Sequence, residues 1–169
     1  MSGSDLLIDG FGRIREIVHE VLDGLDSPAL DFRADAAANS ISWLIWHLTR
    51  VQDDHIAAAG SLEQVWLSGG WEERCGLPLD PLDIGYGHGS EEVAVVRLGP
   101  DLLAGYHDAT FEQTVSFISN LTEADLSKIV DRRWSPPVTM AARLVSVLAD
   151  DLEHAGQAAF IKGLTQRRG

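Results

Sequence analysis

A carboxylate and an imidazole stand four residues apart near the end of the chain, in the segment DDLEHAGQ. If this segment is helical, Asp150 and His154 lie about 40° apart around the helix axis and one turn apart along it. Such a pair can bind one divalent metal ion, because carboxylate and imidazole are ordinary ligands for zinc and related ions. His47, on the apolar side of an earlier predicted helix, is the best candidate for a third ligand.

Three protein ligands would leave coordination positions open to water or substrate, which is typical of a catalytic rather than a structural site. The spacing also has a simpler interpretation, a surface ion pair that stabilises a helix by about 0.3–0.5 kcal/mol. The register is open as well, because Asp151 is three residues from His154 and Glu153 is adjacent to it. His47 alone could equally be a core histidine bonded to a backbone carbonyl.

Four segments have the apolar spacing of three and four residues that predicts helices. They span about residues 5–25, 41–59, 101–120 and 139–164. We therefore predict an all-α fold, an up-down four-helix bundle, with residues 1–169 forming a single domain. The connection after the second helix is so long that it must be functional or partly helical.

That long connection, residues 61–89, is irregular and rich in glycine. We expect a short helical turn at Trp71–Cys75 and a further short helix at about residues 90–98. The segment is a candidate lid or pocket wall, although simple packing over one end of the bundle would explain it equally well. His88 within it is a weaker candidate ligand than His47.

Composition excludes several classes of function. The 169 residues are 45% apolar and carry a formal net charge of −13, so the chain should repel phosphate backbones and anionic membranes. No apolar run approaches the length of a membrane span. The single cysteine, Cys75, permits no internal disulfide, and together with the N-terminal sequence this favours a cytoplasmic protein.

The segment NSISWLIWHLTR at residues 39–50, followed some hundred residues later by Asp150 and HAGQ, resembles the DinB-like (YfiT-like) metalloprotein superfamily. The resemblance covers nearly the whole chain. It implies a four-helix bundle that binds a divalent metal ion through His47, Asp150 and His154. Many members have histidine where this chain has Asp150. The carboxylate resembles the mycothiol-dependent maleylpyruvate isomerase branch, which has glutamate there. Because aspartate is shorter, both direct coordination and action through water or through His154 stay open.

The resemblance further implies a thiol S-transferase or isomerase that uses mycothiol, bacillithiol or glutathione with a small-molecule substrate. Zinc is the first choice of metal, and nickel or another divalent ion is the alternative. Arg50 and Arg143 are candidates for holding carboxylates of the thiol cofactor or the substrate. A metal-dependent hydrolase with Asp54 as the base is a second interpretation. A non-enzymatic ligand-binding or stress-response bundle is a third, and the small residues on the last helix would permit a homodimer.

Overall fold

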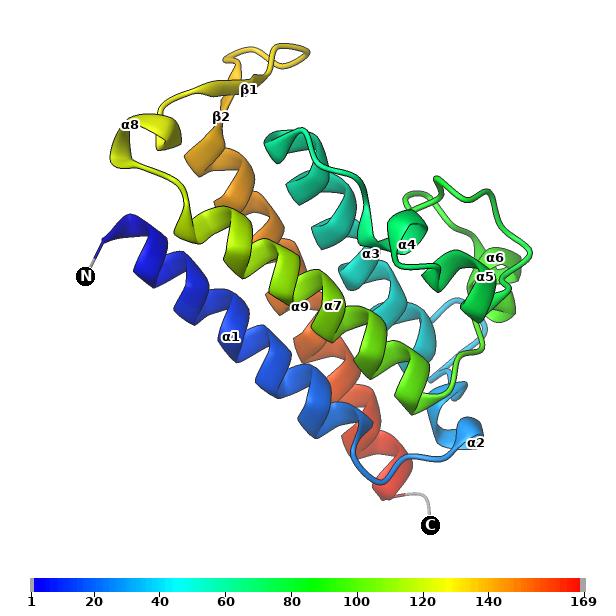
Figure 1. The fold of residues 1–169 in the computed structure, drawn as a ribbon. Helices are drawn as coiled ribbons and strands as arrows, with labels where there is room; N and C mark the ends of the chain where they lie inside the picture. Colours follow the sequence, from blue (N-terminus) through cyan, green and yellow to red (C-terminus); the bar gives the residue numbers. More distant parts are fainter. Residues whose placement is uncertain (1, 168–169) are drawn as a thin grey trace.

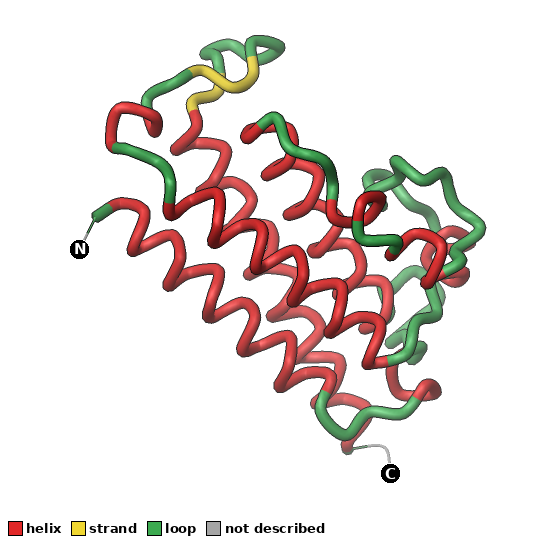
Figure 2. Tube along the Cα trace, in the orientation of Figure 1, coloured by secondary structure: helices red, strands yellow, loops and turns green. Residues whose placement is uncertain are grey.

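The computed structural model describes residues 2–167, and four long helices form its body (Figure 1). They are α1 (Gly3–Leu22), α3 (Ile41–Gly60), α7 (Pro100–Ser119) and α9 (Met140–Gln166). Colouring by secondary structure shows how completely helices dominate the described chain (Figure 2). The all-α four-helix bundle predicted from the sequence is confirmed.

The helix directions reveal a crossover within the bundle. Helices α1 and α9 run one way, and α3 and α7 run the other way (Figure 1). Two contacts fix the parallel pair: Leu98 N donates to Ser42 Oγ near the start of α3, and Gln52 Nε2 donates to Thr114 Oγ1 further along. Successive long helices therefore do not strictly alternate in direction, because a long connection returns the chain from the end of α3 to the start of the parallel α7. Four-helix bundles permit this variation.

Side-chain caps explain where the long helices begin. The hydroxyls of Ser40 and Thr139 accept hydrogen bonds from the third residue of α3 and of α9, respectively. Pro100 occupies the first turn of α7, where its missing N–H costs nothing. These caps satisfy donors that the helices themselves leave unpaired.

The connection after α3 contains three short helices, α4 (Val65–Ser68), α5 (Trp71–Cys75) and α6 (Ser90–Val95). The turn expected at Trp71–Cys75 is confirmed, and the helix expected from residue 90 ends early, at Val95. Two more short helices lie elsewhere, α2 (Ser27–Leu30) and α8 (Glu123–Leu126).

A short antiparallel hairpin precedes α9, formed by β1 (Ile129–Asp131) and β2 (Val138–Thr139). Ile129 pairs with Thr139 and Asp131 with Val138. The hairpin lies at the end of the bundle where α3 finishes and α9 starts (Figure 1). It thereby brings the basic segment around Arg133 close to the groove between these two helices.

Helix α3 is the most enclosed element, because α7, α9 and the crossover connection all pack around it. Every residue from 41 to 53 is buried. Buried polar side chains must find partners within the protein, so the polar residues of α3 have fixed positions. Within residues 2–167, no helix is both long and apolar enough to cross a membrane.

Candidate metal centre

The three residues singled out by spacing meet at one point between α3 and α9. One ligand atom from each of His47, Asp150 and His154 lies within 4.8 Å of the other two. His154 Nε2 is 3.8 Å from Asp150 Oδ1, one helical turn away, and the two imidazole rings lie edge to face. This convergence follows from the close antiparallel packing of the two helices.

The His47 ring is oriented by the crossover connection. Its Nδ1 contacts the backbone carbonyl of Ile84, and a carbonyl can only accept, so Nδ1 carries the proton. The Trp43 indole stacks on a face of the ring, with centroids 4.5 Å apart. Burial lowers the pKa of His47, which favours the neutral ring. The unprotonated Nε2 is thus left to bind a metal ion.

His154 has an equivalent arrangement on α9. Its Nδ1 lies 3.1 Å from Gln157 Oε1, and an amide oxygen accepts the hydrogen bond. In the neutral tautomer that makes this hydrogen bond, Nε2 is the atom available to a metal ion, and it lies 3.8 Å from Asp150 Oδ1. Fixing the second ring nitrogen in this way is the usual means by which proteins orient a histidine ligand.

Burial distinguishes the two neighbouring carboxylates, Asp150 and Asp151. Asp151 points into the bundle, fully buried, and burial raises its pKa well above its ordinary value. Asp150 instead faces His47 and His154. Its Oδ2 atom is buried and has no hydrogen-bond partner among the described residues. An unpaired buried carboxylate oxygen is costly, and a cation would satisfy it.

These observations fit a divalent metal ion. Two neutral imidazole nitrogens and one carboxylate form a donor set of net charge −1, with both ring tautomers already set for coordination. Nitrogen and oxygen donors of this kind suit zinc, with nickel and similar ions as alternatives. The donor count leaves positions free for an exogenous ligand.

Part of the long connection is clamped onto this centre. Gly85 has φ +88°, and a β-carbon there would lie 2.6 Å from His47 Nδ1. The Trp43 indole donates to His88 Nδ1 at 3.1 Å, and His88 Nε2 donates to Asp83 at 2.9 Å. His88 therefore fastens the connection to α3 and does not belong to the ligand cluster.

Arg50 lies away from the position expected for a substrate-binding residue. Its side chain is fully buried, and its guanidinium donates to Asp83 O, Tyr106 Oη and Gln64 Oε1. All three nitrogens are thus engaged by protein groups, and Arg50 does not line the cavity beside the metal centre. It holds the crossover connection in place.

A cavity of about 600 Å³ opens from the metal centre, and His47 and Asp150 form part of its wall. Arg143 lies in the same wall, and its guanidinium is 3.0 Å from Asp131. Arg133 contacts the same carboxylate at 2.8 Å. Asp131 thus pairs with both arginines, and two further carboxylates, Asp54 and Asp150, line the same cavity. We call this cavity the arginine pocket.

One further candidate from the sequence, Asp54, and two residues that the sequence did not single out line the arginine pocket. Asp54 accepts hydrogen bonds from Gln64 and His55, and the His55 contact lowers its pKa. A carboxylate with these partners is a weak base. The exposed aromatic rings of Tyr86 and Trp134 border the pocket from the crossover connection and the hairpin. The glycines and prolines around them were the only sequence signal for such loops.

The comparisons with known proteins identify the family of this chain. The profile of the family described as mycothiol-S-transferase matches residues 6–166. The chain belongs to this family. It is also similar to the crystal structure of a conserved protein from Enterococcus faecalis, with 31% identity, a TM-score of 0.90 and 96% of each chain covered. The search of curated proteins found no match. The DinB-like resemblance seen in the sequence is thereby confirmed.

Proposed function

We propose that this mycothiol-S-transferase family member is a divalent-metal-dependent enzyme that joins a mycothiol-type thiol, through its sulfur, to a small electrophile. The observation that carries the proposal is the convergence of His47, Asp150 and His154 beside a cavity that contains two arginines. Family membership supports a mycothiol-type thiol.

A divalent ion bound by the three residues would lower the pKa of a coordinated thiol and so favour the nucleophilic thiolate. The remaining tasks fall to protein side chains. Ile84 and Gln157 keep the ligand histidines in one tautomer. Arg143 and Arg133 offer charge-assisted hydrogen bonds to oxygen acceptors on the thiol cofactor or the substrate.

The transfer itself requires no oxidant. The thiolate sulfur forms a bond to an electrophilic carbon, the bond from that carbon to its leaving group breaks with the electron pair, and the thiol proton is released. His55 lines the arginine pocket beside Asp54, with Nδ1 held by that carboxylate at 2.9 Å. Its Nε2 is a suitable acceptor for the released proton.

The hydrolase interpretation receives less support. It requires a carboxylate base, and the lowered pKa of Asp54 makes this residue a poor one. Family membership also favours thiol chemistry. We therefore retain the transferase as the one proposed function.

Elemental analysis of untagged protein purified without chelator is the first test. We expect about one equivalent of zinc or another divalent ion, lost in the His47→Ala/His154→Ala double variant. The loaded protein should then accelerate loss of mycothiol in the presence of an electrophile more than loss of glutathione or bacillithiol. Absence of metal, with no uptake of added zinc or nickel, would overturn the proposal, and so would thiol-independent turnover.

A further inference from the structure

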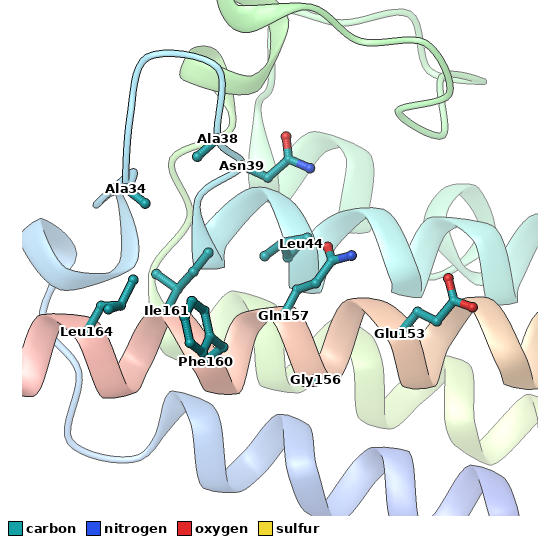
Figure 3. A pocket seen from close by; sticks show the side chains of 10 residues that line it. All are labelled: Ala34, Ala38, Asn39, Leu44, Glu153, Gly156, Gln157, Phe160, Ile161 and Leu164. Carbon is teal, nitrogen blue, oxygen red and sulfur yellow. The ribbon is translucent and has the colours of Figure 1, made fainter.

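A second cavity, of about 510 Å³, follows the C-terminal half of α9 (Figure 3). Helix α9 forms its floor, and the connection between α2 and α3 and the first turn of α3 form its opposite wall (Figure 3). Its lining is mainly apolar and includes Ala34, Ala38, Leu44, Phe160, Ile161 and Leu164. We call this cavity the α9 groove.

The α9 groove lies next to the metal centre. Gln157, which lines it, is the residue that accepts the hydrogen bond from His154 Nδ1. Leu44 is one helical turn before His47 on α3, and Glu153 is adjacent to His154 on α9. Since His47 and Asp150 line the arginine pocket, the metal centre lies between two cavities along one helix pair.

The two cavities differ in chemistry in the way that a two-substrate transfer requires. The arginine pocket offers Arg143, Arg133, Asp54 and His55 to hydrogen-bonding groups. The α9 groove also has polar lining residues, Asn39, Glu153 and Gln157, but it contains no arginine, and its other lining residues are glycine or apolar. An apolar ligand in the groove would therefore contact mainly hydrocarbon and gain from burial.

We propose that the α9 groove binds the apolar portion of the electrophilic substrate, while the arginine pocket receives the thiol cofactor. This assignment rests on the proposed transferase function. It places an apolar, small aromatic or alkyl electrophile on the His154 side of the centre and the thiol on the Asp150 side. The volume of the α9 groove, about 510 Å³, lies within the range of small-molecule sites, about 300–1,000 Å³.

Gly156 permits a direct test. It lines the groove, and a β-carbon built on it meets no atom within 4 Å. Gly156→Leu should therefore fill groove space without a clash, and replacing a helical glycine should not destabilise α9. Gly12 on α1 has the same open surroundings and lies outside the groove. Gly12→Leu is the matched control.

The probe is 1-chloro-2,4-dinitrobenzene, added without thiol to the full ¹⁵N-labelled chain while backbone amide shifts are recorded. Burial raises the pKa of the Cys75 thiol to about 11, so this cysteine should remain unreacted, which mass spectrometry verifies. We expect shifts clustered at residues 153–164. The Kd should rise at least tenfold in Gly156→Leu and stay within twofold in Gly12→Leu.

A kinetic measurement completes the test. In the transfer, sulfur bonds to the ring carbon, chloride leaves with the carbon–chlorine electron pair, and the thiol proton is released. With metal and mycothiol present, Gly156→Leu should raise KM for the aryl chloride at least tenfold and leave KM for mycothiol within twofold.

The outcomes separate the two proposals. Groove binding without any mycothiol transfer in the unaltered chain would refute the proposed function and support the groove as an apolar ligand site. Equal probe binding by all three proteins, or shifts confined to the arginine pocket, would overturn the groove assignment. A dimer that depends on the Phe160 face and excludes the probe, seen by sedimentation, would also overturn it.

Discussion

Gly85 lies so close to His47 that any larger residue would press on the ligand ring. A β-carbon on Gly85 would be 2.6 Å from His47 Nδ1, and the φ of +88° is one that side chains rarely adopt. The neighbouring carbonyl of Ile84 accepts a hydrogen bond from the same ring and so keeps the proton on His47 Nδ1. Gly85, outside α3, thus lies directly against a residue of the candidate metal centre.

We predict that Gly85→Ala weakens metal binding by about 10–100-fold, the usual effect of disturbing a group that orients a ligand. Gly87→Ala is the control, because Gly87 also has positive φ, +79°, but a β-carbon there would meet no atom within 4 Å. Competition titration with a chelator measures both affinities. Equal losses in the two variants would assign the effect to backbone strain alone.

The hydrogen bond between His154 and Gln157 gives a second prediction. Gln157→Leu removes the acceptor and should lower metal affinity by about 10–100-fold, whereas Gln157→Glu keeps an acceptor and should retain most of the affinity. Metal titration followed by calorimetry distinguishes the two variants. If Gln157→Leu binds metal as tightly as the unaltered chain, this contact has no role in orienting His154.

A third prediction concerns pH and does not involve the metal ligands. His107 is fully buried, its Nδ1 lies 3.1 Å from Thr49 Oγ1, and burial lowers its pKa to about 4. Between pH 4 and the ordinary value near 6.5, the unfolded chain binds more protons than the folded chain. The free energy of unfolding contributed by this residue should therefore fall as pH decreases, by about 2 kcal/mol between pH 7 and pH 5.

Urea denaturation at several pH values measures this slope in the metal-free protein. His107→Asn keeps a hydrogen-bonding side-chain amide in place of the Nδ1 atom and removes the imidazole that titrates. The free energy of unfolding of the unaltered chain, minus that of His107→Asn, should fall by about 2 kcal/mol on going from pH 7 to pH 5. An unchanged difference would show that His107 does not titrate in this range.

The sequence was informative where periodicity and spacing apply. The turn of helix at Trp71–Cys75 and all four long helices follow from apolar spacing and caps. The i, i+4 spacing placed Asp150 and His154 on one face, and the apolar setting of His47 directed it inwards. Local rules suffice for these features because helix geometry is itself local.

Features that depend on tertiary packing were beyond these rules. Arg50 is spaced one turn from His47, and nothing local distinguishes a cavity-lining arginine from one buried against Tyr106. The crossover that makes α3 and α7 parallel, and the use of His88 as a fastener, depend on how residues 61–89 fold back. The β1–β2 hairpin was not expected, since its strands have only three and two residues.

A fourth prediction concerns Arg50, whose role is in packing and not in ligand binding. Arg50→Ala should lower the free energy of unfolding by about 3–5 kcal/mol, because it leaves Asp53 buried without its cation and breaks three hydrogen bonds. Chemical denaturation measures this loss. A variant of unchanged stability would show that the network around Arg50 does not hold the crossover.

The fifth prediction concerns Arg143, whose side chain is largely buried at the wall of the arginine pocket. Arg143→Ala should raise KM for mycothiol about tenfold, since one charge-assisted hydrogen bond contributes on the order of 1.5–3 kcal/mol. Stability should change little, because Asp131 keeps Arg133 as a partner. Arg143→Lys should recover only part of the affinity, since lysine cannot donate in the same planar geometry.

Steady-state kinetics, metal content and thermal unfolding of the same samples separate the alternatives for Arg143. Arg97→Ala is the matched control, because Arg97 is exposed and lies outside the arginine pocket. A tenfold rise in KM at full metal occupancy assigns Arg143 to binding of the thiol cofactor. Loss of metal together with activity would instead indicate that Arg143 supports the Asp150 side of the metal centre. An unchanged KM would show that Arg143 does not bind the thiol cofactor.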